Sequence, residues 1–152
     1  MMSNFEPICF EDYLAKYGSL TYRNKGVSMM PLLRQDKDLF TVEKKGPERC
    51  KKYDVVLYKD KMGRYILHRI IKVVSNGYII RGDNTYHNEF RTDSEILGVM
   101  TGFTRDEKEY KVADIGYKLY SVLRSMSYPV RFIHVKIRHY FNVILKKIAG
   151  EG

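Results

Sequence analysis

The chain is poor in cysteine and carries no residue pattern typical of a metal site. Its two cysteines, Cys9 and Cys50, lie far apart in the sequence and fit no zinc-binding spacing. The four histidines form no metal-binding motif either. In a short chain without a secretory signal, two such cysteines are expected to stay reduced. The sequence therefore predicts a cytoplasmic protein with no metal ion and no cofactor.

Long apolar runs are also missing. The first segment, Met1–Gly18, is interrupted by charged residues: Glu6, Glu11, Asp12 and Lys16. A membrane-spanning helix needs about 20 consecutive apolar residues, and a secretory signal needs an apolar region of its own. We expect neither in this segment. Between Phe10 and Tyr17 the apolar residues instead recur at helical spacing, which predicts a short amphipathic helix ending at Gly18.

Acidic residues are absent from the C-terminal region, Ile115–Ala149, although it is rich in basic ones. The basic residues are Lys118, Arg124, Arg131, Lys136, Arg138, Lys146 and Lys147. The apolar residues with helical spacing are Leu119, Val122, Leu123, Met126, Ile133, Ile137, Phe141, Ile144 and Ile148. This pattern predicts two amphipathic helices that meet near Pro129.

Two interpretations of this basic amphipathic region are open. Its apolar side could lie in a membrane interface with the basic residues near anionic headgroups, which would place the protein at the inner face of the membrane. Alternatively, that side packs against the rest of the chain or another subunit. A basic chain also suggests nucleic acid. We expect no such partner, because the sequence has no base-reading motif and the residues before Gly26 are too few for a separate helix-turn-helix.

Short segments rich in β-branched and aromatic residues fill the region between Ser19 and Phe103. Five are expected to be strands: Leu39–Val42, Asp54–Tyr58, Tyr65–Val74, Gly77–Arg81 and Leu97–Phe103. So many short strands in one small domain favour a closed or coiled antiparallel β-barrel. The predicted fold is therefore mostly β, with an N-terminal helical segment (1–18), a β domain (19–104) and a C-terminal helical extension (105–152).

Three short motifs contain the residue types that a serine hydrolase uses. Ser28 lies between Gly26 and Pro31, His68 precedes an arginine, and Asp83 follows a glycine. A serine hydroxyl is a weak nucleophile until a base takes its proton, and histidine, with a pKa of about 6.5, suits that task. The glycine and the proline predict a tight turn that presents the Ser28 hydroxyl. Each residue alone has an ordinary structural explanation, but the ordered set predicts a catalytic site.

The segments around these residues resemble the type I signal peptidases, whose superfamily includes the self-cleaving LexA-type repressors. The resemblance covers roughly residues 20–102 and rests on five segments: Gly26–Pro31, Tyr53–Tyr58, Ile66–Ile71, Gly82–Asn84 and Ile96–Val99. It implies a coiled, mostly antiparallel β-fold of the signal-peptidase type. It also implies the histidine branch of the family, known from the endoplasmic reticulum, because His68 stands where other members have the lysine base.

The resemblance further implies an acidic third residue six positions beyond Asp83, and that residue is Glu89 in place of the usual aspartate. Such a carboxylate would orient the imidazole and stabilise its protonated form. Because glutamate reaches further, Asp83 and Asp93 are alternatives for this role, and Asp83 is also typical of a structural turn. An oxyanion hole at the turn of Gly26 and Ser28 would depend on backbone N–H groups, that of Ser28 first.

We therefore expect a serine endopeptidase that cleaves leader or signal peptides. The resemblance implies an extended substrate with small residues before the cut, bound as an added strand at the sheet edge. A function of another class is also open, namely a catalytically inactive module of the same fold that binds or regulates a partner. Glu89 favours that alternative, as do Lys37–Asp38 and Tyr53–Asp54, where family members commonly have Gly-Asp turns.

Overall fold

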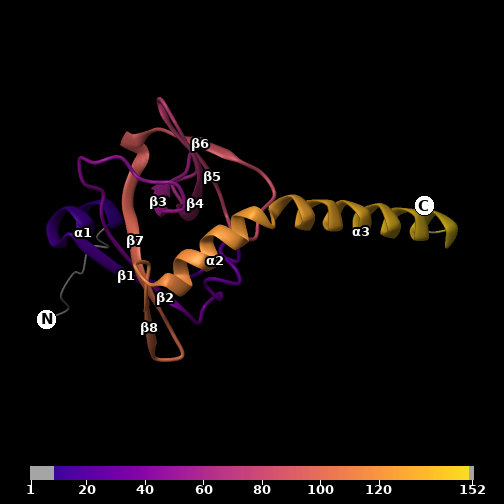
Figure 1. Cartoon of the computed structure of the whole chain (residues 1–152), viewed down its shortest axis with the longest axis horizontal. Helices are drawn as coiled ribbons and strands as arrows, with labels where there is room; N and C mark the ends of the chain where they lie inside the picture. Colours follow the sequence, from indigo (N-terminus) through magenta and orange to yellow (C-terminus); the bar gives the residue numbers. More distant parts are fainter. Residues whose placement is uncertain (1–8, 151–152) are drawn as a thin grey trace, which may run out of the picture.

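The computed structural model describes residues 9–150. In this range the chain forms one eight-stranded antiparallel sheet, preceded by a short helix and followed by two longer ones (Figure 1). The strands are β1 (Ser19–Arg23), β2 (Leu39–Lys44), β3 (Val55–Lys59), β4 (Tyr65–Val74), β5 (Gly77–Arg81), β6 (Glu89–Arg91), β7 (Ile96–Arg105) and β8 (Lys108–Lys111). The helices are α1 (Phe10–Tyr17), α2 (Ile115–Met126) and α3 (Tyr128–Ile148), with a 3-10 turn at Asp93–Glu95.

The strand order across the sheet is β1–β2–β7–β3–β4–β5–β6, and β8 pairs with β7 beside this path. Within residues 9–150 the two outer strands, β1 and β6, do not pair with each other. The predicted mostly antiparallel β fold is confirmed, but the sheet is not a closed barrel. The outer strands are short and largely exposed, since β1 buries only Leu20 and β6 buries no residue. Both are therefore edge strands of the sheet.

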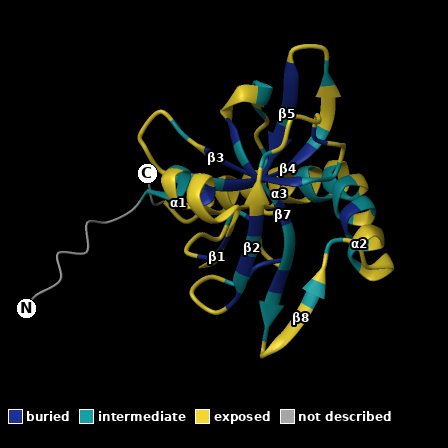
Figure 2. Cartoon of the chain, turned by 90° about the vertical axis from the view of Figure 1, so that its left-hand side faces the viewer, coloured by how far each residue is buried: buried dark blue, intermediate teal, exposed yellow. Residues whose placement is uncertain are grey.

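Two apolar cores lie on opposite sides of the central strand β3. Successive residues of a strand point to opposite faces, so Val55 and Leu57 enter one core while Val56 and Tyr58 enter the other. The first core also receives Leu14 from α1, which is the only buried residue of that helix. In Figure 2 the buried residues accordingly follow the strands at the middle of the sheet.

The helix predicted at the N-terminal end is confirmed as α1, whose C-cap Gly18 takes the left-handed conformation at φ 77°. The five predicted strands are present, with small shifts at their ends. Three further strands, β1, β6 and β8, were not expected. The β-structure also continues past residue 104, because β7 runs to Arg105 and β8 folds back onto it.

The predicted division of the C-terminal region into two helices is confirmed. Helix α2 ends at Met126 and α3 begins at Tyr128, with Pro129 in its first turn. Figure 1 shows α3 extending away from the sheet. In the part of the chain that the structure describes, no helix is both long enough and apolar enough to cross a membrane.

Candidate active site

Ser28 lies in the turn that follows β1, as the flanking glycine and proline predict. The Met30 N–H donates to the Val27 carbonyl at 3.1 Å and closes this turn around the serine. Ser28 is half-buried, and among the described residues neither its hydroxyl nor its N–H has a hydrogen-bond partner. The Gly26 carbonyl, by contrast, accepts a hydrogen bond from the Asn24 amide at 2.8 Å. The Ser28 N–H is therefore a free donor beside a free hydroxyl.

His68 is a buried residue of β4, with 5% of its surface exposed. Its Nδ1 lies 3.3 Å from Oε1 of Glu89 and 3.2 Å from the hydroxyl of Tyr58. The second carboxylate oxygen of Glu89 accepts hydrogen bonds from Tyr58 at 3.0 Å and from Arg91 at 2.9 Å. Of the three carboxylates considered for this position, Glu89 is thus the one that contacts the imidazole.

The hydrogen bonds assign the tautomer of His68. Tyr58 has a single hydroxyl hydrogen, and that hydrogen points to Glu89. Toward Nδ1, both the Tyr58 oxygen and the Glu89 carboxylate can only accept. We therefore assign the imidazole hydrogen to Nδ1, which leaves a lone pair on Nε2. That lone pair is what a general base needs.

Burial lowers the pKa of the His68 imidazole below its ordinary value, and the negative charge of Glu89 opposes part of this effect. Burial also raises the pKa of the Tyr58 hydroxyl, and the Glu89 charge raises it further. At neutral pH the imidazole is therefore uncharged and able to accept a proton. Tyr58 keeps its own hydrogen and stays a donor to the carboxylate.

Gly82 brings the serine main chain and the imidazole to the same small space. A β-carbon at this position would lie 2.7 Å from the Ser28 carbonyl oxygen and 3.0 Å from Nε2 of His68. The approach to the carbonyl oxygen is too close for a carbon atom, and the approach to Nε2 is tight, so the arrangement favours glycine. Nε2 of His68 and the Ser28 carbonyl oxygen therefore both lie against Gly82, although the Ser28 hydroxyl and Nε2 form no hydrogen bond with each other in this structure.

The residues after Gly82 fasten the serine turn to the sheet. The Asn84 N–H donates to the Ser28 carbonyl at 2.7 Å, and its side-chain amide donates to the Val27 carbonyl at 3.2 Å. The Asp83 carboxylate forms a two-point ion pair with Arg69, at 2.8 Å for each contact. It also accepts from the Tyr120 hydroxyl at 2.9 Å. Asp83 thus holds the turn in place and does not hydrogen-bond to the imidazole.

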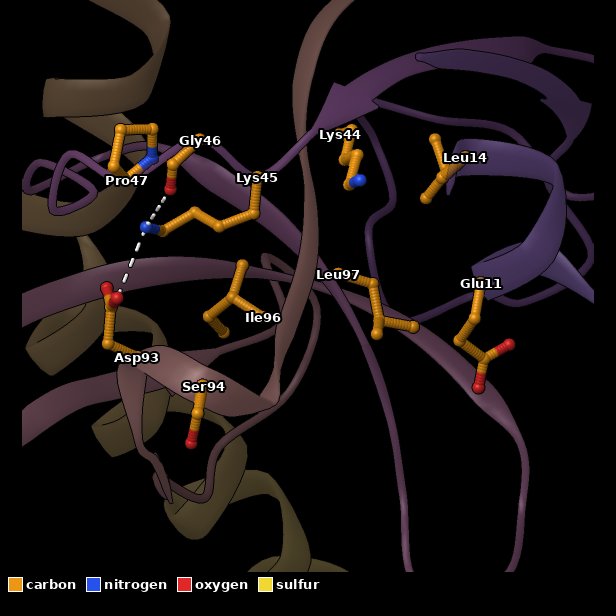
Figure 3. A pocket seen from close by; sticks show the side chains of 10 residues that line it. All are labelled: Glu11, Leu14, Lys44, Lys45, Gly46, Pro47, Asp93, Ser94, Ile96 and Leu97. Carbon is orange, nitrogen blue, oxygen red and sulfur yellow. Dashed lines mark hydrogen bonds and ion pairs between the residues drawn. The ribbon is translucent and has the colours of Figure 1, made fainter. Parts of the chain in front are cut away.

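Asp93, the other candidate for orienting the ring, lies elsewhere. Figure 3 shows Asp93 and Lys45 lining the same surface pocket, with the Lys45 ammonium contacting the Asp93 carboxylate at 3.2 Å. Its other oxygen accepts a hydrogen bond from Tyr78. These contacts, led by the Tyr78 hydrogen bond, lower the pKa of the Asp93 carboxyl. The structure therefore brings together Ser28, His68 and Glu89, with Asp83 as a support and Asp93 outside the group.

A cavity of about 380 Å³ lies beside Ser28. Its apolar lining residues come from α1 and from four strands: Phe10, Tyr22, Phe40, Leu57, Tyr65, Ile66 and Leu67. Among residues 9–150, strand β1 pairs only with β2, and the first half of β4, up to His68, pairs only with β3. The cavity therefore lies between two strands that each have an unpaired edge among the described residues.

Sequence reasoning missed Tyr58 and Arg91 as parts of this site, and it named Gly82 only as part of the turn before Asp83. The register of β3 and β4 brings Tyr58 to the site, because Val56 pairs with His68 and Tyr58 is therefore a diagonal neighbour on the same face. Gly82 could be identified only from coordinates, because its role is the close approach of two distant segments. In the described part of the chain, no three histidine, cysteine or acidic side chains gather as metal ligands would.

The chain was compared with models of known protein families and with curated proteins. Neither comparison found a match.

Proposed function

We propose that the protein is a serine endopeptidase of the signal-peptidase type that cleaves leader or signal peptides. We also propose that its antiparallel sheet is an open, coiled form of the signal-peptidase fold. The observation that carries the proposal is the position of His68, with Nδ1 against Glu89 and Nε2 toward the Ser28 turn. The same spatial arrangement, a nucleophile beside a base that a carboxylate orients, recurs in serine peptidases of unrelated folds, whatever the order of the three residues along the chain.

In this mechanism the Ser28 hydroxyl oxygen attacks the carbonyl carbon of the scissile peptide while Nε2 of His68 takes its proton. Glu89 stabilises the resulting imidazolium, and the free N–H of Ser28 donates to the oxyanion. His68 then gives the proton to the departing amine as the C–N bond breaks, which leaves an acyl ester on Ser28. Water, deprotonated by the same nitrogen, hydrolyses the ester and His68 returns the proton to the serine.

The cavity beside Ser28 supports an extended peptide as substrate. A peptide placed between the unpaired edges of β1 and β4 would gain main-chain hydrogen bonds from one or both strands. Alternate side chains of such a peptide would point into the apolar cavity, because the side-chain period of a strand is two. The aromatic walls, Tyr22, Phe40 and Tyr65, fit apolar side chains, and the signal-peptidase resemblance adds that the residues before the cut are small.

The proposal is tested with a proteome-derived peptide mixture, in which mass spectrometry reads the new N-termini made by the purified chain. We expect a set of cuts that share apolar residues before the scissile bond. These cuts disappear with Ser28→Ala and with His68→Gln, whereas Ser94→Ala, which alters a serine beside the pocket of Figure 3, keeps them. Identical cuts with all four proteins would contradict a nucleophile at Ser28.

A non-catalytic peptide-binding module is the second candidate. The observation in its favour is that the Ser28 hydroxyl and Nε2 of His68 form no hydrogen bond. Catalytic hydrogen bonds often form only once substrate binds, so the fate of a bound peptide distinguishes the two candidates. Peptides that are enriched on the unchanged chain, recovered intact, and retained equally by Ser28→Ala would favour the binding module.

A further inference from the structure

The C-terminal helices carry an apolar stripe that runs through both of them. Its members are Ile115, Leu119, Leu123, Met126, Val130, Ile133, Ile137, Tyr140, Phe141, Ile144 and Ile148. Apart from the adjacent pair Tyr140 and Phe141, successive members are three or four residues apart, and the junction between α2 and α3 does not break this spacing. Every member is between 41% and 84% exposed. The stripe is thus a continuous apolar surface with no covering element in the described chain.

The other side of α2 and of the first turn of α3 binds the β domain, and it does so at the candidate site. Ser121 accepts a hydrogen bond from Arg69 at 2.7 Å, and Tyr120 donates to the Asp83 carboxylate. Arg124 and Arg131 both donate to the Asp83 carbonyl, at 2.7 Å and 3.0 Å. None of these residues belongs to the stripe. One alternative from the sequence was that the apolar stripe packs against the rest of the chain. The structure shows that the polar and aromatic side of the helices makes this contact.

Charge indicates what covers the stripe. Residues 115–149 contain seven basic residues and no acidic one. Four of these, Lys136, Arg138, Lys146 and Lys147, lie on α3 and form no ion pair with another described residue. An apolar stripe flanked by unpaired positive charges fits a surface that is apolar inside and anionic outside. A bilayer with acidic lipids has both properties.

We infer that α2 and α3 bind the surface of an anionic membrane, with the apolar stripe in the acyl boundary and the basic residues at the headgroups. Because the same helices hold Asp83, this contact would keep the Ser28 cavity at a fixed position relative to the bilayer. A second copy of the chain fits less well, because pairing two such helices through their stripes would bring only like charges together. The inference does not depend on peptidase activity.

The test is flotation of the full chain with vesicles of phosphatidylcholine, alone or mixed with phosphatidylglycerol. We expect binding to the mixed vesicles that weakens as salt rises. The double variant Ile137→Ser/Phe141→Ser should lower the partition coefficient about tenfold or more, since two exposed stripe residues lose their apolar surface. Val135→Ser is the matched control: Val135 is exposed but lies two residues from Ile137, on the opposite side of α3. It should bind like the unchanged chain.

Further variants distinguish membrane binding from peptidase activity and from dimerisation. Lys136→Gln/Lys147→Gln should weaken binding to the mixed vesicles and leave the fold unchanged by circular dichroism. Ser28→Ala should bind fully, which separates this inference from the proposed function. The inference is overturned if the unchanged chain does not float with mixed vesicles, or if the stripe variant floats equally well. A dimer in sedimentation analysis that the stripe variant abolishes, without vesicle binding, would assign the stripe to a second copy.

Discussion

The two faces of β4 place neighbouring residues in opposite situations. His68 and Arg69 are both buried, at 5% and 1% exposure, and each has a carboxylate partner. On one face the imidazole is neutral beside Glu89, whose side chain is 24% exposed. On the other, the permanently charged Arg69 pairs with Asp83, whose side chain is 3% exposed. The His68 face can therefore accept and release a proton. On the other face, the Arg69–Asp83 pair holds the Gly82–Asn84 turn, which is hydrogen-bonded to Ser28.

Replacing Glu89 by glutamine gives the largest effect that this comparison predicts. The amide keeps the size of the side chain but removes the charge that stabilises the imidazolium and fixes the hydrogen on Nδ1. We expect kcat/KM on a cleaved peptide to fall by about 10³ to 10⁴-fold, the order seen when a triad carboxylate becomes an amide. Steady-state kinetics on a peptide found in the cleavage screen measures it.

Asp93→Asn is the control for that substitution, because it removes a carboxylate with its own lysine and tyrosine partners away from the imidazole. Its kcat/KM should stay close to that of the unchanged chain. If Asp93→Asn and Glu89→Gln lost activity equally, the role of Glu89 as the orienting carboxylate would be wrong.

Asp83→Asn tests the opposite face. The substitution keeps the shape of the side chain but leaves the buried Arg69 guanidinium without a counter-charge. Removing one partner of a buried ion pair costs about 3–5 kcal/mol, so the free energy of unfolding in urea should fall by that amount. Asp36→Asn removes the exposed pair with Lys25, and asparagine tolerates the positive φ of 56° there, so its effect should be near zero. Equal losses would contradict a structural role for Asp83.

The helices and the candidate site residues could be predicted from the sequence. The β7–β8 hairpin and the contacts between the candidate residues could not. Helix α1 follows from apolar spacing closed by Gly18, and the two C-terminal helices follow from their stripe and Pro129. Strand β8 could not be predicted, because its hairpin turn uses Asp106 and Glu107 at positive φ, 48° and 65°. Aspartate is usual at the first of these positions, but the second usually holds glycine and here holds Glu107.

The open sheet and the pairing of the carboxylates are tertiary properties. Nothing local in the sequence distinguishes Asp83 from Glu89 as the partner of His68, since both are acidic residues close to β5. The structure separates them because Asp83 follows Gly82 directly and reaches Arg69, whereas Glu89 begins β6, which pairs with β5. Assigning the carboxylates therefore needed the strand register, which a single sequence does not give.

Gly82→Ala tests the contact between the serine turn and the base. The added methyl group would push the Ser28 carbonyl away from the His68 ring, and a displacement of about 1 Å can cost about 10²-fold in rate. We expect kcat/KM to fall by this factor while circular dichroism shows the native fold. Gly46→Ala is the control, since its β-carbon would meet no atom within 4 Å. Unchanged kinetics for Gly82→Ala would mean that the two segments need not approach so closely.

The smallest predicted effect is on the pH dependence of the free energy of unfolding. It should depend on His68, on one face of β4, and not on the Arg69–Asp83 pair on the other. Burial lowers the pKa of His68 in the folded chain. As the pH falls below about 6.5, the imidazole is therefore protonated in the unfolded chain at a higher pH than in the folded chain. The free energy of unfolding should therefore fall from that pH down to the folded pKa, by about 1.4 kcal/mol for each unit of lowering. Urea titrations between neutral and mildly acidic pH measure it. His68→Gln should remove this part of the slope, whereas Asp83→Asn should keep it, because Arg69 does not titrate in this range. An identical slope in His68→Gln would mean that the imidazole is not held neutral by the fold.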